Sequence, residues 1–204
     1  MIYLLRHGEI EQSEEKRFVG QADLPLNHNG LRQAQEWCEK FKTRSFANIY
    51  SSDLNRARQT ALIITGHHPE EIRFHSDLRE INLGEWEGLS VAEVQTRFPA
   101  EWEQREKNLV SFRHPGGESF RDLAARVGPV FNQIRQEGKG NILIVAHAGV
   151  NRVILCQILG MPLANLFRLG QDYGSLNLLA PDKNFWRVVA MNIPAECPWI
   201  EFKG

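Results

Sequence analysis

The chain has 204 residues, and 42% of them are hydrophobic, so it can bury a substantial core and lacks the composition of a disordered protein. Its 24 Lys and Arg residues nearly balance its 25 Asp and Glu residues. This balance argues against a nucleic-acid-binding protein, which needs a basic surface, and any anionic ligand must be bound by local positive charge.

The cysteines and the amino terminus predict where the protein works. Cys38, Cys156 and Cys197 are far apart and form no C-x-x-C pair, which is typical of a reduced, intracellular protein. The first apolar run stops at Arg6 and is too short for a signal peptide, and no later run is long enough to cross a membrane. We therefore expect a cytoplasmic protein without a membrane partner.

The first part of the chain predicts two strands, each followed by a helix. Ile2–Leu5 is a continuous apolar run, as in a strand that is buried on both faces. The polar stretch 9–29 predicts a long loop, which in a compact protein is more often functional than idle. A helix begins near Gly30, with apolar residues recurring on one face. Residues 47–50 predict the second strand and residues 54–65 the second helix.

The middle of the chain predicts a short strand, a loop and a short helix. Residues 72–74 predict the strand, and the Gly- and Glu-rich stretch 78–88 predicts the loop. Ser90 is expected to cap a helix over residues 91–97, with Glu93 completing a capping box.

The last part of the chain returns to the alternation of helix and strand. Residues 98–118 are charged and aromatic, and within them 101–107 predicts a solvated helical face or part of a lid. The clearest helical periodicity covers 120–134. The apolar run 142–145 predicts a fourth strand, and residues 150–159 predict a further helix. Two more strands are expected at 175–179 and 186–191.

This alternation predicts an α/β fold of three layers, with a mostly parallel central sheet and helices on both faces. The sequence contains no repeat and no interior linker. We therefore expect a single domain over residues 1–204.

Side chains suited to an anion follow three of the predicted strands. Arg6–Glu9 follow the first strand, and His147–Gly149 follow the fourth. Ser51–Asp53 follow the second strand and are expected to cap the next helix, with Arg56 one turn further on. Ligands of open α/β sheets bind at the carboxyl ends of the strands. We therefore expect two histidines and two arginines to converge on one site.

Those groups suit phosphoryl transfer without a metal or another cofactor. The forks of Arg6 and Arg56 match the oxygens of a phosphate. A neutral His7 can attack phosphorus and form a covalent intermediate, while a protonated His147 can donate to an oxygen as charge develops. The backbone N–H groups at the start of the helix that follows, at Ala148, form a natural anion site. Positioning and charge stabilisation are the main needs of this reaction.

Two of these assignments have rivals in the sequence. The leaving group needs a proton, and Glu80 is our choice as general acid, although Glu85 and Glu87 lie in the same loop and chemistry alone barely separates the three. Arg58 is an alternative to Arg56, but it lies about 200° around the helix, so both cannot face one pocket.

The sequence also gives expectations for Trp86 and for the remaining histidines. Trp86 could pack in the interior or line the pocket. The remaining histidines show no metal-ligand spacing and are predicted to be surface residues: His28, His67, His68, His75 and His114.

These motifs resemble those of the histidine phosphatase superfamily, also called the phosphoglycerate mutase-like family. The resemblance covers Met1 to about Gly160 in the family's order. It implies that Glu80 is the general acid and that Arg56, the first arginine of its motif, binds phosphate. The matching segments are Leu4–Glu9 for the nucleophile, Gly20–Leu26 for the substrate loop, Ser51–Ala61 for the second arginine, Leu78–Gly88 for the acid and Val145–Gly149 for the second histidine.

The resemblance also implies a small phosphorylated substrate, with loop contacts from Ser13, Gly20 and Gln21. Position 13 departs from the family's mutases, many of which have Asn there. Phe112–Ser119 and the short length are similar to the alpha-ribazole phosphatase branch, whose members remove the 5′-phosphate of alpha-ribazole phosphate in cobalamin synthesis. The implied function is thus an alpha-ribazole phosphatase.

Other functions stay open at this point. Close relatives act on sugar phosphates or phosphoserine. A phosphoglycerate mutase is less expected, because the mutases' longer insertion with its lysine and paired arginines is not evident. A non-catalytic phosphate-binding module is the least expected. The sequence allows a homodimer without indicating one.

Overall fold

The structure is a computed structural model that describes residues 1–11, 15–137 and 140–198. Its centre is a six-stranded sheet in the order β3-β2-β4-β1-β5-β6. The first four strands of this order run parallel, whereas β5 pairs antiparallel with β1 and with β6. The strands are β1 Ile2–Arg6, β2 Asn48–Ser51, β3 Ile72–Phe74, β4 Ile142–Ala146, β5 Leu176–Pro181 and β6 Trp186–Ile193.

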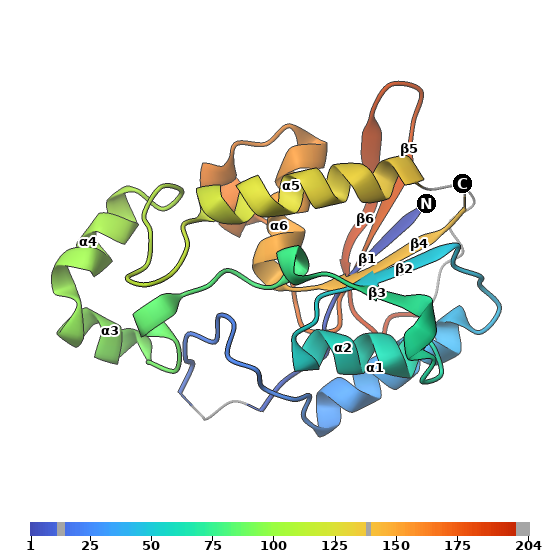
Figure 1. Cartoon of the computed structure of the whole chain (residues 1–204), viewed down its shortest axis with the longest axis horizontal. Coiled ribbons are helices and arrows are strands. Elements are labelled where there is room, and N and C mark those ends of the chain that lie inside the picture. Colours follow the sequence, from blue (N-terminus) through green and yellow to red (C-terminus); the bar gives the residue numbers. More distant parts are fainter. Residues whose placement is uncertain (12–14, 138–139, 199–204) are drawn as a thin grey trace.

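Helices cover both faces of this sheet (Figure 1). Side chains alternate between the two faces along a strand, so in β1 Tyr3 and Leu5 pack in the core beneath α1 and α2, while Ile2 and Leu4 pack beneath α5 and α6. The mostly parallel three-layer fold is therefore confirmed. The helices are α1 His28–Phe41, α2 Asn55–Ile64, α3 Val91–Arg97, α4 Pro99–Lys107, α5 Phe120–Glu137 and α6 Ala148–Leu159.

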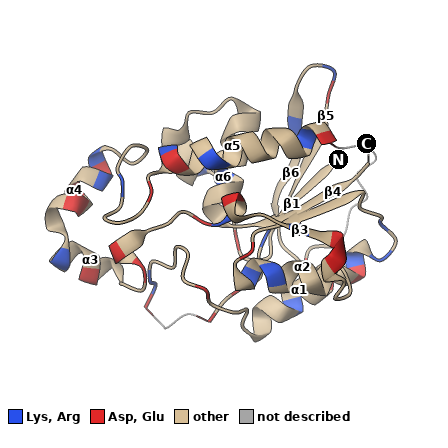
Figure 2. Ribbon diagram, viewed as in Figure 1, with Lys and Arg blue, Asp and Glu red and all other residues tan. Residues whose placement is uncertain are grey.

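Short 3₁₀ segments occupy several of the connections, and two of them frame the loop that follows β3. They are Pro69–Glu71, Ser76–Leu78, Gly84–Trp86 and Leu163–Arg168. Both signs of charge occur on each of α3, α4 and α5 (Figure 2). None of the helices in the described ranges is long and apolar enough to cross a membrane.

The amino-terminal ends of α3 and α2 can be compared with the helix caps predicted from the sequence. In α3 the Ser90 side chain accepts from the Glu93 backbone and the Glu93 side chain accepts from the Ser90 backbone, so the capping box is confirmed. The cap predicted for α2 is wrong. This helix begins after Leu54 without a side-chain cap, because Ser51 bonds the Ser52 carbonyl and Asp53 is engaged with Arg79.

A third cluster of apolar residues includes side chains from α3 and α4. These two helices lie to one side of the sheet (Figure 1). Trp86 is the fully buried centre of this cluster, with the Trp102 ring centroid 6.0 Å and the Phe112 centroid 5.5 Å away. Trp86 is thus a packing residue. The charged run 101–107 lies in α4, where its face is only partly solvated, because Trp102 joins this cluster.

Candidate active site

The carboxyl ends of β1, β2 and β4 bring distant residues to one place. Arg6 pairs with Ala146 and Ser51 pairs with Val145 across the parallel ladder, so the residues that follow lie at the same edge. The ring centroids of His7 and His147 are 5.0 Å apart. A pocket of about 310 Å³ opens beside them, within the size range of small-molecule sites. His7, Arg6, Arg56, Glu80 and Ala148 line it, and His147 lies fully buried against His7.

The imidazole of His7 has a defined tautomer. Its Nδ1 lies 2.7 Å from the Gly8 carbonyl oxygen, which can only accept, so Nδ1 carries the hydrogen. The Nε2 lone pair accepts from the Arg56 Nε–H at 3.2 Å. Burial, followed by the charges of Arg56 and Arg6, holds the pKa of His7 well below its ordinary value. The ring is therefore neutral near pH 7, with its lone pair on the atom that faces the arginine.

His147 presents one nitrogen without a protein partner. Its Nε2 lies 2.8 Å from the Ser52 hydroxyl, which also accepts from the Leu54 backbone N–H. Among the described residues, Nδ1 of His147 has no hydrogen-bond partner, although it is buried. If the Ser52 hydroxyl donates to Nε2, Nδ1 carries the hydrogen and can donate to a ligand.

The charge state of His147 depends on what it faces. Burial and then the charge of Arg56 hold the pKa of His147 well below the ordinary value. The protein's own groups thus favour a neutral ring rather than the expected imidazolium. The double negative charge of a phosphate monoester placed against the ring would favour the protonated form.

The two arginines are held by backbone carbonyl groups and by an aromatic ring. Arg56 is 1% exposed and donates to the Ala22 carbonyl at 2.6 Å and the Gly20 carbonyl at 2.7 Å. Arg6 donates to the Gln171 carbonyl at 2.6 Å, and its guanidinium carbon lies 3.7 Å from the centre of the Tyr173 ring. Burial lowers the pKa of both arginines, yet the ordinary value is so high that both stay charged.

The rival residues of the sequence analysis lie elsewhere. Arg58 is exposed, and its guanidinium lies over the Phe74 ring. Glu85 is exposed as well. Glu87 accepts from the backbone N–H groups of Gln21 at 2.7 Å and Leu83 at 3.1 Å, so it joins two loops. Among the three glutamates of this loop, the described lining of the pocket includes Glu80 alone.

The Glu80 carboxylate lies at the start of α6. Its Oε1 accepts from the Ile81 N–H at 2.9 Å and its Oε2 accepts from the Gly149 N–H at 3.0 Å. A Cβ atom on Gly149 would lie 2.3 Å from Glu80 Oε1, so only glycine leaves room for this arrangement. The carboxylate is thus held at the amino-terminal end of a helix, beside Ala148.

The predicted substrate loop is placed in part. Gly20 lines the pocket with a φ of +53°, a conformation that favours glycine. Gln21 is not among the described lining residues, and its side chain instead donates to the Glu80 carbonyl at 3.0 Å. Ser13 lies outside the described residues.

The pocket also has walls that sequence reasoning missed. Phe120 belongs to the helical periodicity of 120–134, and Tyr173 lies beyond the segment that carries the motifs. The Nε of Arg105 is buried without a hydrogen-bond partner among the described residues. None of the residues of these walls was singled out as a site residue: Ile10, Arg17, Phe18, Val19, Ile81, Leu83, Arg105, His114, Phe120, Arg152, Phe167 and Tyr173.

The prediction that His114 is a surface residue is wrong. It is 3% exposed, and its Nδ1 lies 2.7 Å from the Glu118 carbonyl oxygen. Its ring meets the edge of Trp86 at a centroid distance of 4.9 Å, and burial lowers its pKa. The lack of metal-ligand spacing says nothing about packing, which is why the sequence misled. Across the described ranges, no three His, Cys, Asp or Glu residues lie close enough to hold a metal ion.

Taken with the fold, this arrangement places the chain among α/β enzymes that bind a phosphoryl group. Residues 2–194 match the Histidine phosphatase superfamily (branch 1). The chain belongs to this family, and it is a phosphoric monoester hydrolase.

Similar proteins carry several different names. The chain is 36% identical over 163 residues to the probable phosphoglycerate mutase GpmB of an Escherichia coli strain, which covers 79% of this chain and 75% of that protein. A Shigella boydii protein of the same name is 33% identical, with 91% and 86% covered.

Solved structures agree with the fold. A putative alpha-ribazole-5′-P phosphatase from Escherichia coli has a TM-score of 0.87, with 94% of this chain and 95% of that chain covered. At 23% identity, this likeness shows the fold alone. A mycobacterial glucosyl-3-phosphoglycerate phosphatase, solved in complex with VO3, is 29% identical with a TM-score of 0.82, and 94% and 98% of the two chains are covered.

Proposed function

We propose that the chain hydrolyses small phosphomonoesters through a phosphohistidine on Nε2 of His7. One observation carries this proposal. His7 is buried and neutral, its Nδ1–H is fixed on the Gly8 carbonyl, and its Nε2 lone pair faces the Arg56 guanidinium at 3.2 Å. A phosphate oxygen would compete for that N–H and bring phosphorus to the lone pair.

The first step forms the covalent intermediate. The Nε2 lone pair forms a bond to phosphorus while the bond from phosphorus to the ester oxygen breaks. Protonated Glu80 gives its proton to that oxygen, and the neutral alcohol leaves. Arg6, Arg56 and the Nδ1–H of His147 stabilise the charge on the phosphoryl oxygens.

The second step restores the enzyme. Ionised Glu80 takes a proton from water, and the water oxygen bonds to phosphorus as the bond to His7 breaks. Inorganic phosphate is released, His7 regains its lone pair and Glu80 regains its proton. The balance needs water alone as a co-reactant.

We propose alpha-ribazole 5′-phosphate as the physiological substrate, with a role in cobalamin synthesis. The observation in its favour is the pocket wall beside the catalytic groups, which includes Phe18, Phe120, Phe167 and Leu83. Such a wall suits an alcohol that carries an aromatic, weakly polar group. A broad-specificity phosphatase for sugar phosphates or phosphoserine is the alternative for the same site.

A second candidate function is that of a phosphoglycerate mutase. The observations in its favour are the names of the relatives at 33–36% identity and the basic part of the pocket wall, Arg105 and Arg152. These arginines could hold the carboxylate of an acidic alcohol.

The catalytic proposal is tested by two variants. His7→Ala should abolish both turnover and the phosphoenzyme trapped by acid quench, and persistent activity would rule out the assigned nucleophile. Glu80→Gln should lower kcat/KM, which reports the step in which the alcohol leaves, about 100-fold or more for alkyl phosphates and much less for p-nitrophenyl phosphate, because nitrophenolate leaves without a proton. Equal slowing of both esters would exclude Glu80 as the acid.

The substrate is tested by a panel. We expect kcat/KM for alpha-ribazole 5′-phosphate to exceed the values for sugar phosphates, phosphoserine and 3-phosphoglycerate. Isomerisation of 3-phosphoglycerate that is faster than phosphate release would favour the mutase. Comparable rates on all the esters would favour broad specificity.

A further inference from the structure

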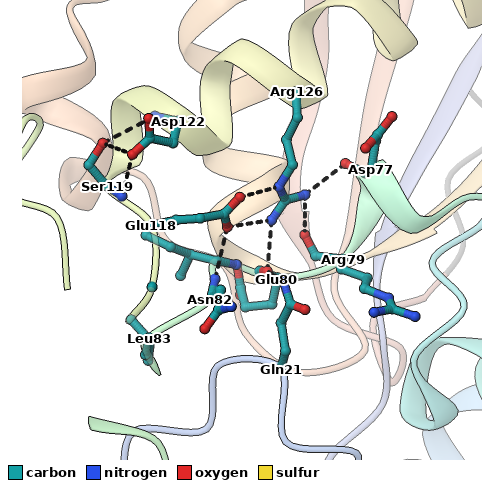
Figure 3. Close-up of polar contacts among 12 residues, drawn as sticks. Gln21, Asp77, Arg79, Glu80, Asn82, Leu83, Glu118, Ser119, Asp122 and Arg126 are labelled. Carbon is teal, nitrogen blue, oxygen red and sulfur yellow. Dashed lines mark hydrogen bonds and ion pairs between the residues drawn. The ribbon is translucent and has the colours of Figure 1, made fainter. Parts of the chain in front are cut away.

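We propose that Arg126, held by Glu118, is a positioning residue that fixes the general acid Glu80 in the site. This inference rests on the role proposed above for Glu80. Arg126 projects from α5 toward the loop that follows β3, and its guanidinium lies among the backbone carbonyls of that loop (Figure 3).

Every N–H of the Arg126 guanidinium is used. Its Nη1 donates to the carbonyls of Asp77 and Arg79, both at 2.8 Å. Its Nη2 donates to the Glu80 carbonyl at 2.8 Å. Two further bonds, from Nε at 2.7 Å and from Nη2 at 2.9 Å, reach the two oxygens of Glu118. A guanidinium has five N–H groups, so none is left for a substrate phosphate.

Glu118 fixes the guanidinium and the loop at the same time. Its Oε2 also accepts from the Asn82 N–H at 2.9 Å, and its own N–H donates to the Asn82 carbonyl at 2.8 Å. The side chains of Arg126 and Glu118 are only 17% and 20% exposed, so solvent screens this two-point ion pair weakly.

The backbone just before Glu118 packs closely against the loop that carries Glu80. Gly84 has a φ of +54°, and a Cβ there would lie 2.0 Å from the Pro115 carbonyl oxygen. A Cβ on Gly117 would lie 2.4 Å from the Asn82 carbonyl oxygen. The turn before α5 and the acid loop are therefore in direct backbone contact.

The start of α5 is fixed as well. Asp122 accepts from the Ser119 N–H at 2.8 Å and from its hydroxyl at 2.5 Å, which caps the first turn (Figure 3). Arg126 lies in the second turn of the same helix, so the helix start and the guanidinium form one rigid support.

These contacts hold Glu80 in place through both its backbone and its side chain. Its carbonyl accepts from Arg126 on one side and from the Gln21 side chain on the other, while its carboxylate accepts from Ile81 and Gly149. The 3₁₀ segment Ser76–Leu78 ends before Arg79. Beyond it, the guanidinium supplies hydrogen bonds that a helix or a sheet would otherwise provide. Arg126 is outside the described lining of the pocket and acts through Glu80.

The test compares two esters in each variant. Arg126→Met should lower kcat/KM for an alkyl phosphate, which reports the step in which the alcohol leaves, on the order of 100-fold, the loss expected when an acid moves by about 1 Å. The same variant should change kcat/KM for p-nitrophenyl phosphate less than about threefold, because that leaving group needs no proton. Hydrolysis of the phosphohistidine, which also uses Glu80, is common to both esters and does not enter this comparison.

Arg113 offers a matched control. Arg113 also pairs with a carboxylate at the start of α5, Asp122, at 2.6 Å, but its side chain is exposed and its hydrogen bonds go to Asp122 and the Gly117 carbonyl, not to residues 77–80. Arg113→Gln should leave both esters unaffected. Should Arg126→Met fail to fold, Glu118→Gln tests the same contact, and it should slow the alkyl ester more than the nitrophenyl ester.

The double variant gives the sharpest result. In Glu80→Gln the acid is already lost, so adding Arg126→Met should slow the alkyl ester no further. If the losses of the two single variants instead multiply in the double variant, this inference is overturned and the proposed function still stands. Equal slowing of both esters in Arg126→Met has the same meaning. A wild-type enzyme that forms no phosphohistidine would instead overturn the proposed function.

Discussion

Lowering the pH from 7.5 to 5.5 should destabilise the folded protein through two buried imidazoles. The pKa values of His7 and His147 are held well below the ordinary value, first by burial and then by Arg56. In the unfolded chain each imidazole has a pKa of about 6.5 and takes up a proton over this interval, while the folded state does not. Because the unfolded state then binds more protons, stability falls as the pH falls.

When the pKa values of both imidazoles in the folded protein lie below 5.5, the loss of stability between pH 7.5 and 5.5 depends only on their pKa in the unfolded chain. Each imidazole contributes a loss of about 1.4 kcal/mol in the free energy of unfolding, so the pair contributes about 2.7 kcal/mol. His114, whose pKa burial also lowers, adds to the loss in the same direction. The carboxylates with lowered pKa values, such as Asp53, titrate below this window.

Urea unfolding at the two pH values measures the loss, and His7→Gln isolates one imidazole. The pH-dependent loss should be about 1.4 kcal/mol smaller in this variant than in the wild-type protein. His28→Gln, which removes an exposed imidazole, is the control and should leave the loss unchanged. The same loss in His7→Gln as in the wild type would show that the folded state protonates His7, and the neutral-nucleophile argument would fail.

Three further changes test the surroundings of the acid and the chemistry. Gly149→Ala places a Cβ 2.3 Å from Glu80 Oε1, which lies at the end of a flexible side chain. Displacement of this carboxylate should lower kcat for alkyl esters about tenfold or more, and kinetic assays measure this loss. The free energy of unfolding should fall by about 1 kcal/mol in urea unfolding. In Gly84→Ala the new Cβ would lie 2.0 Å from the Pro115 carbonyl oxygen, at a backbone φ of +54°. The free energy of unfolding should therefore fall by about 2–3 kcal/mol. An unchanged urea midpoint would contradict this packing. EDTA should leave activity unchanged, and inhibition that added Mg²⁺ or Zn²⁺ reverses would point to a metal.

Local sequence patterns were enough to predict the elements and the edge where the site forms. Continuous apolar runs such as Ile142–Val145 are typical of strands covered on both faces, and the structure has β4 there, fully buried. The meeting of His7 and His147 also followed, because parallel strands end at one edge of a sheet. These features depend on residues that are close in sequence or on a general rule of topology.

Only the tertiary structure decided which partners the polar groups find. The same sequence rules left Glu80, Glu85 and Glu87 nearly equal, and the structure separates them by exposure and contact. It also buries His114 and surrounds the Arg126 guanidinium with carbonyls 46 to 49 positions away in the chain. A guanidinium or an imidazole carries no local signal of its partner, because that partner is set by how helices and loops pack on the sheet.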